Sequence, residues 1–189
     1  MTKYSRLIFF GPPGAGKGTQ AKQLSNECEI PHIATGDILR QAIAEQTKVG
    51  EKAQTYVENG DLVPDEVLAE LVRDRLQQPD AQPGWILDGF PRTINQAEFL
   101  DQLLDELNTS YDLVIYLDVP DEVLMERLLG RGRKDDSEET IRHRLDIFHN
   151  QTEALINFYQ QRNHFLQVDG NQPLPKVTER IKTAMKEGY

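Results

Sequence analysis

The sequence predicts an α/β fold in which a five-stranded, mainly parallel sheet forms the middle of three layers. Five short runs are apolar, helical patterns separate them, and the runs are continuously apolar instead of alternating with polar residues. Continuous apolarity is typical of parallel strands that are covered by helices on both faces. The expected strands are residues 7–10, 31–34, 85–88, 113–119 and 165–169.

Helical patterns fill the intervals between these strands. A helix is expected over residues 17–27, directly after the first strand, and another where apolar residues recur at a spacing of three and four from Ala97 to Leu107. Apolar positions from Ile141 to Tyr159 predict one longer helix, entered through Asp136 and Ser137. The spacing of Val177, Ile181 and Met185 predicts a closing helix.

One stretch, from about residue 35 to 64, contains no strand. It holds two or three helical segments that pause at Gly50 and Gly60. A helical excursion between the second and third strands predicts an insert over the edge of the sheet. The 189 residues otherwise fit one domain, 1–189, with a single core.

Composition excludes several classes of protein. The formal net charge of −10 argues against nonspecific binding of nucleic acid, which needs a basic face. No apolar run is long enough to cross a membrane, and the N-terminal run is too short for a secretion signal, so we expect a cytoplasmic protein. Cys28 is the only cysteine, which leaves no disulfide framework and no cysteine-rich zinc site. We interpret Cys28 as a half-buried filler in the first helix.

Residues 11–20, GPPGAGKGTQ, follow the first strand and open the first helix. Glycines let the backbone curl so that successive N–H groups point at an anion, and the helix directs its positive end at the same place. Lys17 can extend along a phosphate chain as a point charge. The context of strand, glycine-rich turn and helix predicts a nucleotide phosphate site. Its expected contacts are Gly14, Ala15, Gly16, Lys17, Gly18 and Thr19.

This loop departs from the usual pattern, in which Ser or Thr follows the lysine and its hydroxyl reaches Mg²⁺. Here Gly18 follows Lys17, and Thr19 is rotated by a further helical step of about 100°. We therefore expect Mg²⁺ to be held mainly by phosphate oxygens and water. Asp88, at the end of the third strand, is the expected carboxylate of the outer shell, although it could instead cap the turn into Gly89. Whether Thr19 touches the metal stays open.

Further stretches match known signatures across nearly the whole chain, and in the same order. The loop with its Gly-Thr pair resembles the nucleoside monophosphate kinases. Two other signatures are similar to those of adenylate kinases: residues 35–40, TGDILR, and residues 88–93, DGFPRT. Residues 60–65, 127–131 and 133–136 match as well, with Arg144 downstream. The segment between Arg131 and Ser137 is too short for an inserted β-subdomain or a four-cysteine zinc site, so the chain resembles the short-lid type.

The resemblance implies a site for AMP. Thr35 would contact the adenine, although it could also serve as a helix N-cap, and Gln96 would be the second adenine contact. Arg40 and Arg92 are placed to clamp the AMP phosphate with their planar guanidinium groups. The wall residues Leu62 and Val63 could equally be core packing of the insert. The complete expected AMP set is Thr35, Gly36, Arg40, Asp61, Leu62, Val63, Gly89, Phe90, Pro91, Arg92, Gln96, Arg133 and Arg144.

The resemblance also assigns residues to ATP and to a short lid at 131–137. Arg127 would stack on the adenine of ATP, Arg131 would reach its phosphates, and Gly170 and Gln172 would form the loop beside the base. Arg133 and Arg144 would bracket the phosphoryl group in transfer, whereas Arg142 would face solvent. Asp135 and Asp136 would cap the following helix or organise the lid arginines.

The expected reaction is MgATP + AMP ⇌ 2 ADP in a monomer without nucleic-acid or membrane partners and without structural zinc. The acceptor oxygen is already ionised, so no general base is needed, and catalysis rests on alignment and charge stabilisation. The expected catalytic residues are Lys17, Arg92, Arg131, Arg133 and Arg144, and the four histidines are read as structural or solvent-facing. Two alternatives remain: a kinase for UMP/CMP or GMP, and a nucleotide-dependent switch or ATPase.

Overall fold

The computed structural model describes residues 4–133, 136–162 and 164–187. Its sheet has five parallel strands in the order β2-β3-β1-β4-β5. The predicted α/β fold with a five-stranded parallel sheet is thereby confirmed. The strands are β1 (Arg6–Phe10), β2 (His32–Ala34), β3 (Trp85–Asp88), β4 (Leu113–Asp118) and β5 (Phe165–Asp169).

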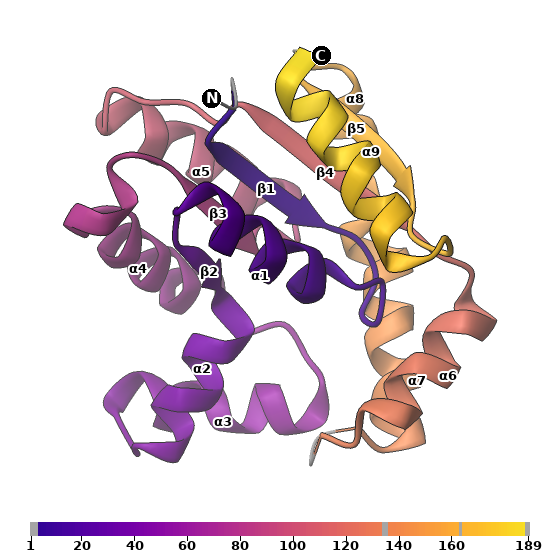
Figure 1. Ribbon diagram of the computed structural model, residues 1–189. Helices are drawn as coiled ribbons and strands as arrows, with labels where there is room; N and C mark the ends of the chain where they lie inside the picture. The colour runs from indigo at the N-terminus through magenta and orange to yellow at the C-terminus, as the bar shows by residue number, and fades with distance from the viewer. Residues whose placement is uncertain (1–3, 134–135, 163, 188–189) are drawn as a thin grey trace.

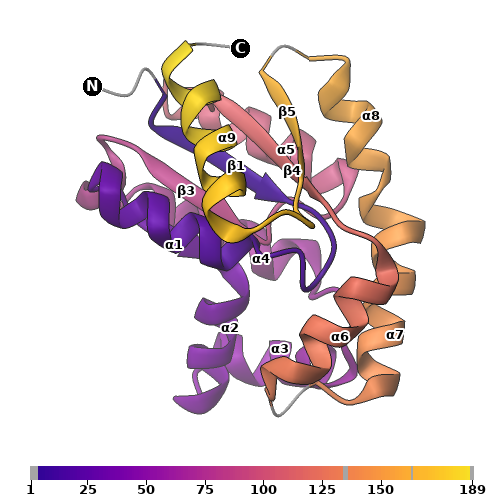
Figure 2. The same cartoon turned by 45° about the vertical axis from the view of Figure 1, so that its right-hand side comes forward.

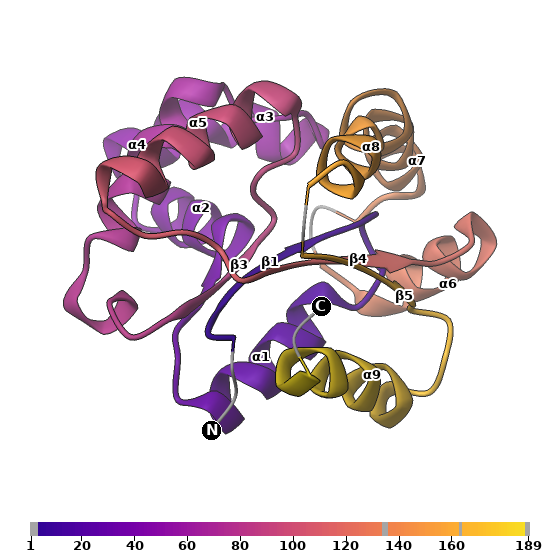
Figure 3. The same cartoon turned by 90° about the horizontal axis from the view of Figure 1, so that it is seen from above.

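Helices cover both faces of the sheet (Figure 3). The helices α1 and α9 lie on one face, and α4, α5 and α8 lie on the other. None of the helices in the described part of the chain has the length and apolarity of a membrane-spanning segment. The α-helices are α1 (Lys17–Cys28), α2 (Thr35–Ala44), α3 (Lys48–Asn59), α4 (Asp65–Leu76), α5 (Ile94–Glu106), α6 (Asp121–Arg131), α7 (Glu138–Ile147), α8 (Ala154–Gln160) and α9 (Leu174–Glu187).

Alternate residues of β1 supply the two halves of the core. Leu7 and Phe9 pack with α1, α6 and α9, whereas Ile8 and Phe10 pack with α4, α5 and α8. All four side chains are buried, which is why this strand reads as a continuous apolar run. The two cores fix the sheet rigidly, and the ends of its strands carry the loops that form the site.

Several predicted boundaries differ from the structure, and three of these differences have consequences for the fold or its hydrogen bonds. Pro31 precedes β2, since it has no N–H to donate to a ladder, although its carbonyl accepts a hydrogen bond from the Ile86 N–H at 2.9 Å. At the other strand, β4 ends at Asp118 and not at Val119. The single long helix expected up to Tyr159 is interrupted by a π-helical turn, Phe148–Thr152, between α7 and α8. A π turn adds a residue to the helical cycle, and here both of its end residues, Phe148 and Thr152, are buried.

Between β2 and β3, which are neighbours in the sheet, the chain departs from the sheet. The helices α2 and α3 extend beyond the carboxyl ends of the strands, as Figure 1 shows in purple. They pack so closely that a Cβ atom added to Gly50 would lie 2.1 Å from the Ala42 carbonyl oxygen. The Gly50 N–H also donates to the hydroxyl of Thr47, the N-cap of α3. Gly50 therefore permits the close approach of the two helices.

Replacing Gly50 with Ala should lower the free energy of unfolding by about 2–3 kcal/mol, because backbone atoms must move to admit the new methyl group. Denaturant unfolding of purified protein measures this change. Gly130→Ala in α6 is the matched control: its Cβ would meet nothing within 4 Å. That variant should gain about 0.5–1 kcal/mol from the better helix former. Equal stability of both variants would contradict this account of the α2–α3 packing.

Candidate active site

A cavity of about 220 Å³ lies at the carboxyl ends of the strands, between the phosphate loop, the helices α2 and α3, and the arginines of the segment after α6. A second, smaller hollow continues it towards the π turn and shares Pro13, Lys17 and Arg144 with it. The predicted site residues that line the first cavity are Gly14, Lys17, Gly18, Thr35, Gly36, Arg40, Asp61, Leu62, Val63, Asp88, Gly89, Arg92, Arg131, Arg133 and Arg144. Pro91 lines the second hollow.

The phosphate loop leads directly into α1. Gly16, the N-cap of α1, has a left-handed backbone with φ 95°, and the helix begins at Lys17. The Lys17 ammonium donates hydrogen bonds to the carbonyl oxygens of Gly11 and Pro12, both at 2.8 Å. Burial lowers the pKa of Lys17 to about 8; the charge of Asp88 opposes this shift, and those of Arg92 and Arg131 add to it. The loop thus presents a half-buried cation at a helix N-terminus, which favours a bound anion.

Asp88 lies between the loop and β2. Its Oδ2 atom is 3.1 Å from Nε2 of His32, and its backbone carbonyl accepts a hydrogen bond from the Thr35 hydroxyl at 3.3 Å. Thr35 is the first residue of α2, and the N-cap of this helix is Ala34. The Thr35 hydroxyl donates to the Asp88 carbonyl at the end of β3 and does not cap α2. The alternative that Thr35 is the helix N-cap is therefore wrong.

The space beside Asp88 fits a hydrated metal ion better than a protein side chain. A Cβ added to Gly18 would lie 3.4 Å from Oδ2 of Asp88, so a larger residue there would point into the gap between loop and carboxylate. Glycine leaves that gap open, and a carboxylate with hydrogen-bonding capacity to spare is a suitable partner for metal-bound water. In the described residues, no three His, Cys, Asp or Glu side chains gather as a metal-binding group. Thr19 is exposed and does not line the cavity.

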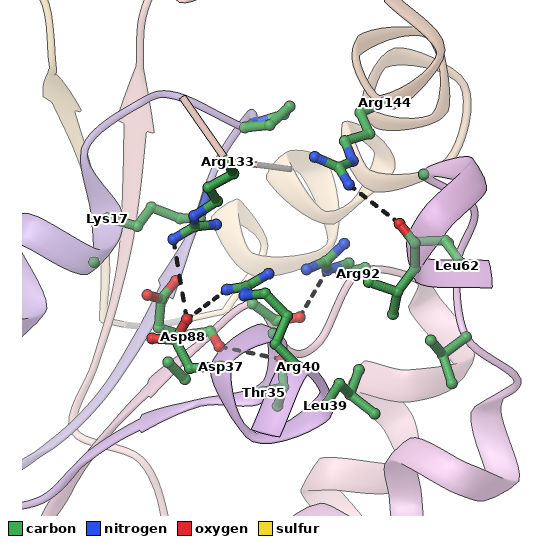
Figure 4. Close-up of a pocket in the computed structure, with 18 of the residues that line it drawn as sticks. Lys17, Thr35, Asp37, Leu39, Arg40, Leu62, Asp88, Arg92, Arg133 and Arg144 are labelled. Atoms are coloured by element: carbon green, nitrogen blue, oxygen red, sulfur yellow. Dashed lines mark hydrogen bonds and ion pairs between the residues drawn. The ribbon is translucent and has the colours of Figure 1, made fainter. Parts of the chain in front are cut away.

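Arginines from separate segments converge on the cavity (Figure 4). The guanidinium groups of Arg40, Arg92, Arg133 and Arg144 point towards the same space as the Lys17 ammonium. Nε of Arg92 donates to the Gly89 carbonyl at 2.8 Å, which fixes the direction of its side chain. Burial lowers the pKa of Arg92; Asp88 counteracts this, and Arg144 and Arg40 lower the pKa further. The cavity is therefore strongly cationic although the whole chain is acidic.

Asp136 holds two of these arginines. Arg131 binds its carboxylate with two hydrogen bonds, of 2.8 and 2.7 Å, and Arg144 donates to it at 3.1 Å. The Asp136 side chain is only 1% exposed, so its charge is available to the arginines and hardly to water. The N-cap of α7 is Ser137, not Asp136, and of the two expected roles the structure shows the organising one. Lys134 and Asp135, in the middle of the expected lid, lie outside the described residues.

The segment that carries these arginines touches the α2–α3 region across the cavity (Figure 2). Arg144 donates to the carbonyl of Val57 at 3.2 Å, and Nε2 of His143 lies 2.6 Å from Oδ1 of Asp61. Arg133 approaches the carboxylate of Asp37, at 4.0 Å. Arg142 instead faces solvent, as predicted, and it forms an ion pair with Glu138.

Some predicted residues lie away from the two hollows. Arg127 donates to the Gly170 carbonyl at 3.1 Å, so the structure brings together two residues assigned to the ATP base, and Gln172 binds Asp169 at 2.7 Å. Phe90 is fully buried in the core, and Ala15 is also buried. The residues Ala15, Gly16, Phe90, Gln96, Arg127, Gly170 and Gln172 line neither hollow.

The structure also adds residues that the sequence did not indicate. Asp37 forms an ion pair with Arg40 one turn along α2, and a spacing of three on a helix could have suggested it. His32 contacts Asp88 although it looked like an ordinary strand residue. Leu39, Val57 and Leu68 contribute apolar wall to the cavity. No local pattern marks these, because their role comes from packing between α2, α3 and α4.

Comparison with known proteins agrees with this geometry. The family model for adenylate kinase matches residues 9–164. The chain is 53% identical over 181 residues to "Adenylate kinase 1" of Nostoc sp., covering 96% of this chain and 98% of that one. It is 52% identical to the adenylate kinase of Trichodesmium erythraeum, with 94% and 95% covered, and 44% identical to that of Clostridium perfringens, with 93% and 96% covered. The chain belongs to the adenylate kinase family.

Proposed function

We propose that this chain transfers the γ-phosphoryl group of ATP reversibly to AMP, giving two ADP, with Mg²⁺ bound to ATP. As a member of its family it is a phosphotransferase. One observation carries the assignment to two nucleotides: the phosphate loop with Lys17 and the separate pair Arg40 and Arg92 line the same cavity. A switch or ATPase needs the first anion site but has no use for the second. A UMP/CMP or GMP kinase would share both sites, and the relatives do not favour it.

The residues divide into three groups around the transferred phosphoryl. Lys17 and the N–H groups of the phosphate loop hold the ATP phosphates, and Arg40 and Arg92 hold the AMP phosphate. Arg131, Arg133 and Arg144 reach the same cavity from the other side and stabilise charge on the phosphoryl group in transit. Since the acceptor is an ionised phosphate oxygen, this arrangement needs only alignment and charge.

Mg²⁺, when bound, screens the phosphate oxygens and offsets the charge that develops on them. Asp88 would hold it through water, in the gap that Gly18 leaves open. A direct bond from Thr19 is not part of this proposal, since Thr19 is exposed.

We further propose that residues 35–64 form the AMP-binding insert and residues 131–137 a short lid on one core domain of 1–189. Arg133 of the lid approaches Asp37 of the insert at 4.0 Å, and His143 and Arg144 of the following helix contact Asp61 and Val57 of the insert, as closure over both substrates requires. Closure keeps water from accepting the phosphoryl group. We expect Thr35 and Gln96 at the adenine of AMP, Arg127, Gly170 and Gln172 at the adenine of ATP, and a cytoplasmic monomer.

The acceptor identity is tested by a coupled assay that offers AMP, CMP, UMP or GMP with MgATP. AMP should give turnover at least about 100-fold faster than any other acceptor, because a site built to hydrogen-bond one base leaves polar groups unpaired with another. Chelation of Mg²⁺ should abolish it. Faster use of CMP or UMP would replace this proposal with its rival, and ATP hydrolysis independent of AMP would indicate an ATPase.

Replacing Arg92 with Ala should lower kcat/KM for AMP by about 100-fold, because a half-buried charged partner of the AMP phosphate is lost. The Kd for ATP, measured by calorimetry, should change less than about threefold. Arg142→Ala is the matched control, since Arg142 belongs to the same cluster of arginines but faces solvent. Equal losses for both nucleotides would contradict the assignment of Arg92 to the AMP side.

The lowered pKa of Lys17 gives a prediction about pH. Below about 8 the ammonium is charged, and above it the group becomes neutral and loses its attraction for phosphates. The kcat/KM for ATP, which reports the free enzyme, should therefore fall as pH rises through about 8. Lys17→Arg keeps its charge throughout, so its profile, though lower, should lack this limb. A wild-type profile that stays flat to a pH of about 9.5 would show that deprotonation of Lys17 does not limit kcat/KM for ATP in this range, contrary to the prediction.

A further inference from the structure

The side-chain amide of Gln96 is held at both ends. Gln96 lies in the first turn of α5 and is 2% exposed. Its Oε1 atom accepts a hydrogen bond from the Arg92 N–H at 2.8 Å, and its Nε2 atom donates to Oδ1 of Asp65 at 2.7 Å. Both bonds join Gln96 to residues next to the AMP side of the cavity: Arg92 lines it, and Asp65 follows the wall residue Val63 by two positions.

These two contacts permit only one orientation of the amide. Turning it over would place its NH₂ group against the Arg92 N–H and its oxygen against the carboxylate of Asp65. The first contact would bring two donors together and the second two acceptors. An amide oxygen accepts two hydrogen bonds and an amide nitrogen donates two. In the orientation that the structure shows, these two bonds leave one acceptor position and one donor position of the Gln96 amide unused.

We propose that Asp65 is a positioning residue that selects adenine over 6-oxopurines by locking the amide of Gln96. Adenine carries a donor amino group at position 6 beside ring acceptors, and a glutamine amide recognises this pair with its oxygen and nitrogen. Hypoxanthine and guanine carry an acceptor oxygen at position 6, which repels the oxygen of the locked amide and could accept only from the NH₂ group of a reversed one. This inference rests on the proposed function, because it requires Gln96 at the base of AMP.

Asp65 is well placed to act on a residue of another helix. It is the first residue of α4, and the N–H groups of Val67 and Leu68 bind the Pro64 carbonyl, which fixes the start of the helix. Buried side chains of α4 and α5, among them Leu68 and Leu100, belong to the same core cluster. The two helices lie side by side on one face of the sheet (Figures 1 and 3). The carboxylate therefore reaches Gln96 from a firmly held backbone.

An ordinary explanation of Asp65 is that it stabilises the N-terminus of α4 through its charge. Glu66, the next residue, is exposed and has the same charge in the same turn of the helix. Glu66→Ala therefore removes an equivalent charge and serves as the matched control. Asp65→Asn removes the charge and replaces the acceptor-only carboxylate by an amide, which can turn over and pair with either orientation of Gln96.

The experiment measures kcat/KM for AMP and for IMP, with MgATP as donor, in the wild type, Asp65→Ala, Asp65→Asn, Glu66→Ala and Gln96→Ala. Thermal unfolding of each variant checks that it is folded. In Asp65→Ala the AMP:IMP ratio should fall about tenfold, through a higher KM for AMP with kcat largely kept, because the Arg92 contact alone still opposes reversal of the amide. Asp65→Asn should lower the ratio as well, since its amide can pair with either orientation of Gln96, whereas Glu66→Ala should keep it within about twofold of the wild type.

An unchanged ratio in Asp65→Ala, with a reduced ratio in Gln96→Ala, would overturn the role of Asp65 and leave the proposed function intact. A ratio that falls as far in Glu66→Ala as in Asp65→Ala would also overturn it, since negative charge at the N-terminus of α4 would then account for the loss. An unchanged ratio in Gln96→Ala would overturn both this inference and the placement of Gln96 at the base. Absence of turnover with AMP in the wild type would instead refute the proposed function itself.

Discussion

Repulsion among the cations around one cavity is the constraint on which the rest of the site depends. Lys17, Arg92 and Arg131 lie near enough for the two arginines to lower the pKa of the lysine, and Arg40 and Arg144 act likewise on Arg92. In a low-dielectric pocket such like charges are costly unless anions separate them. Asp37, Asp88 and Asp136 supply those anions from three different elements of the chain. The acidic composition of the protein thus serves a cationic site.

The fold determines where these charges can meet. The carboxyl ends of parallel strands lie along one edge of the sheet, and β1 leads there into the phosphate loop while β3 ends in Asp88. Successive side chains of β1 are buried in the two cores on opposite faces of the sheet. This packing fixes the position of β1 and of the edge at which the strand ends. A ligand site at this edge is the general expectation for open α/β sheets. The helices α2 and α3 then bring Arg40 over the same edge from the opposite side of the cavity.

Local sequence patterns predicted the parts of this site that depend on neighbours in the chain. Buried strands, the loop around Lys17, and the convergence of Arg40 with Arg92 followed from short stretches or from a resemblance across them. The π turn at Phe148 did not, because its apolar residues still fit an approximate helical spacing. Nor did the contacts of His32 with Asp88 and of Asp65 with Gln96, which join residues 56 and 31 positions apart. Such contacts depend on strand order and helix packing, which single-sequence periodicity does not contain.

The carboxylates that hold the arginines also fit the proposal that the site accepts two polyanions. Phosphate oxygens and carboxylate oxygens accept the same forked hydrogen bonds from guanidinium groups. Arg40 and Arg133 face Asp37, and Arg131 and Arg144 share Asp136, so each arginine already points along a direction fixed by an acceptor. An arriving phosphate then takes over a guanidinium that is already oriented and does not have to order a free side chain. Asp136, nearly inaccessible to water, holds Arg131 and Arg144 together, and in the proposed reaction both guanidinium groups would lie beside the one phosphoryl group in transfer.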